Sequence, residues 1–144
     1  MPKPFDAIII GSGQAGSSLA VWLAQAGMKT ALIEREHLGG TCVNDGCIPT
    51  KTLVASARAA HMACRAGHYG VLVGGEVAVD MKAVMARKNT IVQASLDNLA
   101  SWLGGTENRT LVWGSVRFTD AHTVELNGDA LSAPRHFTRP VWRR

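Results

Sequence analysis

The sequence predicts an α/β fold of the Rossmann type, with a parallel sheet, helices and a small antiparallel β segment. A short β-branched run ends at Gly11, a glycine-rich turn at 11–16 opens a helical pattern, and a second apolar run follows within about thirty residues. This order of strand, helix and strand is typical of the βαβ unit of a parallel sheet. From Leu111 the apolar residues recur at every second position, which indicates the strands of the antiparallel segment.

The first three elements follow from their residue patterns. Residues 5–10 read as a buried strand because the run Ile8 to Ile10 is β-branched. Residues 17–26 carry leucines and alanines at helical spacing and stop at Gly27. Residues 30–33 form the second strand, which ends in Glu34.

The later elements are two helices and several strands. Pro49 suits the first turn of a helix that we expect to run to Arg65, and Asp80 caps a second helix that ends near Leu103. The predicted strands are residues 111–113, 116–118 and 123–126. Asn127-Gly128 is a strong signal for a hairpin turn after them.

The length and the charge of the sequence limit the classes of protein to which it can belong. The 144 residues allow about one domain at a prior of roughly 150 residues per domain. Four of the 15 basic residues lie in the last ten positions, so the net charge of +4 belongs to the tail, and residues 1–134 balance. No apolar stretch approaches the roughly 20 residues that cross a bilayer. We therefore expect a cytoplasmic protein with no nucleic-acid partner and no membrane span.

The turn Gly11-Ser12-Gly13-Gln14-Ala15-Gly16 fits the pattern of a dinucleotide-binding loop. The first glycine permits the tight turn, the second lets the backbone approach a pyrophosphate, and the third lets helix and strand pack closely. Glu34 lies 23 residues after Gly11, where an acid can accept hydrogen bonds from ribose hydroxyls. The alternatives are a chance glycine-rich turn and, for Glu34, a solvated charge at a strand end.

Cys42 and Cys47 are separated by four residues and precede a helix. The helix start and Lys51 favour a thiolate there, so the pair has the geometry of a redox centre. A zinc site is the rival, but structural zinc needs four ligands, and Cys64 is the only further thiol. Two unconnected buried cysteines are the remaining alternative.

Residues 39–51, Gly-Gly-Thr-Cys-Val-Asn-Asp-Gly-Cys-Ile-Pro-Thr-Lys, closely resemble the active-site signature of the FAD-dependent pyridine nucleotide-disulfide oxidoreductases. That family includes dihydrolipoamide dehydrogenase, glutathione reductase and mercuric reductase. The resemblance covers residues 5–134 and is strongest to the dihydrolipoamide dehydrogenase and mercuric reductase branch. It implies a partial FAD-binding domain over 1–134.

The resemblance implies a role for each matching residue. Cys42 would be the outer thiol that exchanges with substrate, and Cys47 the thiol beside the flavin ring. Electrons would pass from NAD(P)H through FAD to the Cys42–Cys47 disulfide, and then to a small disulfide or a mercuric ion. No resident metal is implied. The FAD-binding residues that it implies are Gly11, Ser12, Gly13, Ala15, Gly16, Glu34, Arg35, Gly40, Thr41, Cys47, Lys51, Ser115 and Val116.

The resemblance ends at Pro134. Residues 135–144 mix arginine, proline and aromatics, and we expect them to be a foreign basic tail, from truncation or a frameshift, that cannot form the family's next strand. The resemblance also implies that the family's later strand, which returns to the FAD domain, is lost, and that loss would leave an open sheet edge. Four histidines are expected at surface or loop positions, and His37 near the glycine turn. They are His61, His68, His122 and His136.

The resemblance implies a family of homodimers, and we expect these 144 residues to include neither the family's NAD(P)H site nor its dimerisation domain. We therefore expect an oxidoreductase by family that holds FAD weakly and does not turn over NAD(P)H alone. The alternatives are a non-catalytic FAD-binding fragment and a thiol-based metal-binding module.

Overall fold

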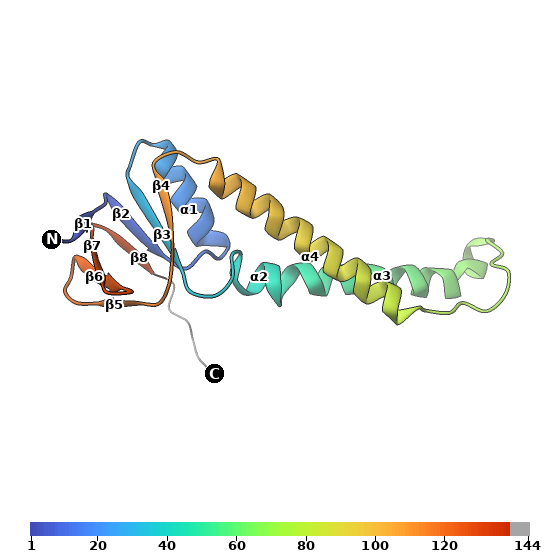
Figure 1. The fold of residues 1–144 in the computed structure, drawn as a ribbon. Helices are drawn as coiled ribbons and strands as arrows, with labels where there is room; N and C mark the ends of the chain where they lie inside the picture. Colours follow the sequence, from blue (N-terminus) through green and yellow to red (C-terminus); the bar gives the residue numbers. More distant parts are fainter. Residues whose placement is uncertain (139–144) are drawn as a thin grey trace. The chain divides into compact units, whose positions relative to one another are not determined.

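The computed structural model describes residues 1–138, which divide into two compact units (Figure 1). One unit combines residues 1–40 with the chain from Leu96 onward, and the other comprises residues 41–95. The first unit contains both sheets and the second is helical. No helix in the described residues is long and apolar enough to cross a membrane.

The main sheet of the first unit has four parallel strands in the order β4-β3-β2-β8. Its centre is β2 (Ala7–Ile10) beside β3 (Thr30–Glu34), and β4 (Arg109–Trp113) lies on the far side of β3. Both central strands are almost wholly buried, as a parallel sheet covered on two faces requires. The predicted βαβ unit is confirmed.

The two faces of this sheet pack against different partners. Ile9 and Leu32 face α1 (Gln14–Gln25), which buries Ala20 and Val21 against them. On the opposite face, Ile8, Ala31 and Ile33 join a core that includes Val124, Leu126 and Leu131 of the second sheet. Neighbouring residues of one strand point to opposite faces, so β2 and β3 feed both cores.

The second sheet has the order β1-β7-β6-β5. Its strands are β1 (Lys3–Pro4), β5 (Val116–Phe118), β6 (Thr123–Leu126) and β7 (Asp129–Ser132). The predicted hairpin turn joins β6 to β7, with a positive φ at both Asn127 (52°) and Gly128 (88°). The first of the later strands, β4, extends the parallel sheet, while β5, β6 and β7 form the antiparallel segment.

The expectation that the tail forms no strand is wrong for its first residues. β8 (His136–Thr138) pairs in parallel with β2, and Ile8 N donates to Arg135 O at 3.0 Å. Phe137 packs into the core beside α1. The hydrogen bonds between paired strands use only backbone groups. A mostly polar segment can therefore form a strand when one apolar side chain, here that of Phe137, packs into the core. β8 therefore covers the edge of β2 and is itself the outer strand on that side of the sheet as described; residues 139–144 lie outside the described part.

One histidine, His136, lies in β8 rather than at the surface or loop position expected for it. His136 is half-buried, its Nε2 is buried with no hydrogen-bond partner, and its ring meets that of Phe118 edge to face at 5.3 Å between centroids. Burial lowers the pKa of His136. His61, His68 and His122 are exposed, as expected.

The helical unit consists of α2 (Gly40–Asn44), which begins at its boundary, then α3 (Cys47–Cys64), η1 (Ala66–Tyr69) and the first part of α4 (Met81–Gly104). The helix predicted from Pro49 begins two residues earlier, at Cys47. The predicted Asp80 cap is confirmed, because Ala83 N donates to Asp80 Oδ1 at 3.0 Å. Arg87 of α4 donates to Thr52 O of α3 at 3.1 Å and ties the two helices together.

Candidate functional site

The glycine turn lies at the carboxyl end of β2 and opens α1. Gly11 has a φ of +102°, which an L side chain rarely adopts, and its N–H donates to Ile33 O at 2.8 Å. A Cβ added to Gly16 would lie 1.9 Å from Gly11 O. Helix and strand therefore meet at Gly16 without room for any side chain, which is the third role expected of the motif.

The start of α1 is open for an anion. Gly13 is its N-cap, and no side chain caps the first turn. A Cβ added to Gly13 would meet nothing within 4 Å, so this backbone faces free space. The first N–H groups of a helix have no intrahelical acceptor and carry the positive end of its dipole. The geometry fits a pyrophosphate, which needs a close backbone approach at this position.

Glu34, the last residue of β3, is buried, with 8% of its surface exposed. Its Oε2 accepts hydrogen bonds from Ser12 N at 2.8 Å and Ser12 Oγ at 2.6 Å. Its Oε1 accepts from the N–H groups of Arg35 at 2.8 Å and Glu36 at 2.9 Å. Burial alone would raise the pKa of Glu34, but these four hydrogen bonds outweigh it and lower the pKa. The alternative of a solvated charge at a strand end is therefore wrong.

Two further segments pack against the glycine turn and Glu34. Gly39 N donates to Ser12 O at 3.0 Å, and a Cβ added to Gly40 would lie 3.1 Å from Gly13 Cα. Gly114 N donates to Glu34 O at 2.8 Å, so Ser115 follows directly on a residue bonded to Glu34. The predicted residues of the glycine turn, Glu34, Gly40 and Ser115 are thus drawn from four separate segments to one end of the parallel sheet.

The other predicted nucleotide residues have less specific positions. Ala15 is exposed in the first turn of α1, and Val116 is the first residue of β5. The Arg35 side chain is 47% exposed and pairs with Glu36 at 3.3 Å, so only its backbone contacts Glu34. The second group of predicted residues, Thr41, Cys42, Cys47 and Lys51, belongs to the unit 41–95.

Cys42 lies on α2 and Cys47 begins α3, with a tight turn between them. Asp45 N donates to Thr41 O at 2.9 Å, and a Cβ on Gly46 would lie 2.9 Å from that same oxygen. This turn folds the chain back and brings the two thiols together.

Cys47 perturbs the pKa of the Cys42 thiol. A side-chain hydrogen bond with Cys47, then desolvation and the charge of Cys47, raise the pKa of Cys42 above its usual value; a backbone hydrogen bond from Cys47 and the charge of Lys51 act in the opposite direction. Cys47 is exposed and Cys42 half-buried. The alternative of two unconnected buried cysteines is therefore wrong. Across residues 1–138 no three His, Cys, Asp or Glu side chains gather as a metal site.

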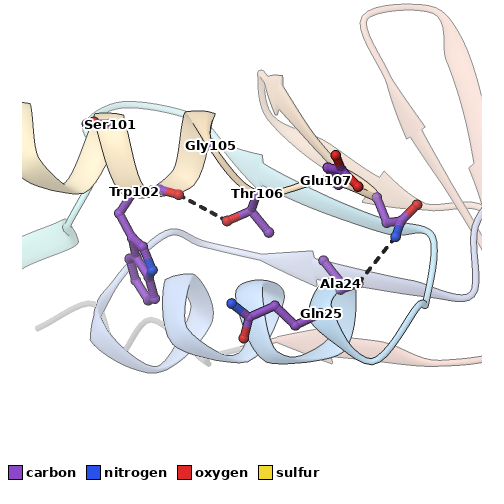
Figure 2. Close-up of a pocket in the computed structure, with 8 residues that line it drawn as sticks. Ala24, Gln25, Ser101, Trp102, Gly105, Thr106 and Glu107 are labelled. Carbon is purple, nitrogen blue, oxygen red and sulfur yellow. Dashed lines mark hydrogen bonds between the residues drawn. The ribbon is translucent and has the colours of Figure 1, made fainter.

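A pocket that the sequence did not indicate lies elsewhere on the first unit (Figure 2). It has a volume of about 450 Å³ and is lined by Gln25, Trp102, Thr106 and Glu107, among others. These residues lie at or just after the carboxyl-terminal ends of α1 and α4, whereas the glycine turn opens the amino-terminal end of α1. The pocket is therefore separate from the glycine turn.

A parallel sheet whose glycine turn opens a helix, with a buried acid ending the next strand, is the Rossmann-type fold typical of dinucleotide-binding domains. The model of the pyridine nucleotide-disulphide oxidoreductase family matches residues 5–135. The chain belongs to that family, and the resemblance stated from the sequence is confirmed. The family uses FAD and NAD(P)H.

Similar proteins include curated enzymes and solved structures. The chain is 40% identical over 119 residues to a dihydrolipoyl dehydrogenase of Rhizobium etli, covering 83% of this chain and 24% of that one. It is 38% identical over 132 residues to a mercuric reductase of Lysinibacillus sphaericus, covering 91% and 24%. The HOCl-induced flavoprotein disulfide reductase RclA from Escherichia coli superimposes with a TM-score of 0.72 at 33% identity, covering 93% and 27%. The chain thus spans about a quarter of the length of these relatives.

Proposed function

We propose that this chain supplies the FAD-binding turn and the redox thiol pair of an FAD-dependent disulfide oxidoreductase. The observation that carries the proposal is the tight turn at residues 41–46, which joins Cys42 on α2 to Cys47 at the start of α3. Family membership makes this pair the expected electron carrier. Gly40, which lies against Gly13 of the glycine turn, is two residues before Cys42 in the chain.

The residues of the first unit fit FAD. The open backbone at Gly13 and the first turn of α1 would hold the pyrophosphate, Glu34 the adenosine ribose, and Ser115 with Val116 the adenine. FAD, when bound, supplies the capacity to take a hydride from NAD(P)H and pass on an electron pair. Lys51, one helical turn after Cys47, would hold negative charge near the thiols.

The thiol chemistry transfers two electrons from the reduced pair to a substrate disulfide. The Cys42 thiolate attacks one substrate sulfur, and the other sulfur leaves as a thiolate and takes up a proton. The Cys47 thiolate then attacks Cys42 Sγ, which forms the Cys42–Cys47 disulfide and releases the second substrate thiol. The tight turn between Cys42 and Cys47 would keep the two thiols close enough for this second step.

The substrate that we propose is a small disulfide or a mercuric ion, as the names of the relatives indicate. We further propose that the 144-residue chain alone does not oxidise NAD(P)H, since its described residues offer one glycine-rich βαβ turn, which FAD takes.

Nucleotide binding tests the proposal directly. Titration of FAD into the purified chain should show binding, and Glu34→Gln should weaken it by about tenfold because a charged hydrogen-bond acceptor is lost. Glu36→Gln is the matched control: that carboxylate is two residues away, 64% exposed, and paired only with Arg35. Equal affinities of the Glu34→Gln variant and the unchanged chain, or no binding of FAD, would contradict the proposal.

A further inference from the structure

The carboxylate of Glu34 has no free position for another hydrogen-bond donor. A carboxylate offers about four lone-pair sites. Backbone N–H groups of Ser12, Arg35 and Glu36 take three of them, and the Ser12 hydroxyl takes the fourth. A ribose hydroxyl that donates to Glu34 must therefore displace one of these four donors.

The Ser12 hydroxyl is the donor that can move. The three backbone N–H groups are fixed by the glycine turn and by the end of β3, whereas a hydroxyl rotates about its side-chain bonds. Ser12 Oγ also lies 3.5 Å from His37 O, a second acceptor within the same loop cluster. The Ser12 residue is fully buried, so water does not supply its alternative partner.

We propose that the Ser12 hydroxyl competes with a ribose hydroxyl for Glu34 Oε2, and turns to His37 O when the ribose hydroxyl binds. Ser12 is thus a specificity-determining residue that lowers affinity for the adenosine ribose. This inference rests on the proposed nucleotide site and adds a role for a residue within it.

Moving the Ser12 hydrogen bond from Glu34 to His37 O weakens ribose binding because the bond to Glu34 is the stronger of the two. The bond to Glu34 is 2.6 Å long and has an ionised acceptor, and such bonds are roughly twice as strong as neutral ones. The bond to His37 O is 3.5 Å long, and that carbonyl already accepts from Gly40 N at 3.4 Å. Part of the ribose–Glu34 bond energy is therefore offset by the loss at Ser12.

The test compares ADP with 2′,3′-dideoxy-ADP by isothermal titration under reducing conditions. Ser12→Ala should tighten ADP binding by about fivefold and leave the dideoxy ligand unchanged, since only a ribose hydroxyl meets the competition. Ser17→Ala is the matched control: it removes a buried hydroxyl of α1, which donates to Ser12 O at 2.7 Å rather than to Glu34. The ratio of the ADP affinity to the dideoxy-ADP affinity should be the same for Ser17→Ala as for the unchanged chain.

The outcomes separate this inference from the proposed function. If the unchanged chain binds ADP and Glu34→Gln weakens it, but Ser12→Ala does not tighten it, the inference is overturned and the proposed function stands. Equal tightening of both ligands would also overturn it. If neither the unchanged chain nor any variant binds ADP, the result contradicts both the inference and the proposed function. Should Ser12→Ala fail to fold, Ser12→Cys replaces the hydroxyl with a weak donor, and its ADP affinity should lie above that of the unchanged chain.

Discussion

Gly16→Ala will lower the melting temperature of the chain by roughly 10 °C. The added Cβ would lie 1.9 Å from Gly11 O, a backbone atom that cannot move without displacing the end of β2. Overpacking of this kind costs about 3 kcal/mol, and each kcal/mol shifts the midpoint of a domain this size by about 3 °C. Thermal unfolding followed by circular dichroism measures the shift.

Gly13→Ala, in the same loop, separates binding from stability. Its Cβ would meet nothing within 4 Å, and the Gly13 φ of −64° suits alanine. We expect the melting temperature to stay within about 3 °C and the ADP affinity to fall at least about tenfold, because the methyl group occupies the path of the pyrophosphate.

A Gly16→Ala protein as stable as the unchanged chain would show that helix and strand do not meet at Gly16.

Mild oxidation will convert the chain's three free thiols to one. Cys42 and Cys47 are joined by the tight turn at residues 41–46, so oxidation should join them, while Cys64 at the far end of α3 keeps its thiol. Thiol titration after denaturation counts the remaining groups, and peptide mapping without reduction identifies the linked pair.

Single variants provide the controls for the pairing. Cys64→Ser should leave no free thiol after oxidation, whereas Cys42→Ser and Cys47→Ser should each form no intramolecular disulfide. A disulfide between Cys64 and either partner would contradict the assignment of the pair.

The local patterns of the sequence predicted much of this site. The glycine turn, the acid after the second strand and the turn at Asn127-Gly128 depend on residues close together in the chain, whose types suit particular backbone shapes. The spacing of Cys42 and Cys47 before a helix likewise indicated a pair, and the structure brings the two thiols together.

Long-range pairing and hydrogen bonding could not be read from the sequence in the same way. β8 pairs with β2 across more than one hundred residues and contains only Phe137 as an apolar anchor, so its composition argued against a strand. The four donors on Glu34 include the Ser12 hydroxyl, and a motif position written as any residue carries no signal for that bond. α2 has only five residues, too few to show a helical period.

The visible spectrum of the FAD-loaded chain on reduction of its thiols tests the central claim that the nucleotide turn and the thiol pair serve one flavin. If Cys47 lies beside the bound flavin, a dithiol reductant should produce a long-wavelength charge-transfer band in the unchanged chain and in Cys64→Ser, and Cys47→Ala should lack it. Identical spectra for the unchanged chain and the Cys47→Ala variant, with FAD bound to both, would contradict the account.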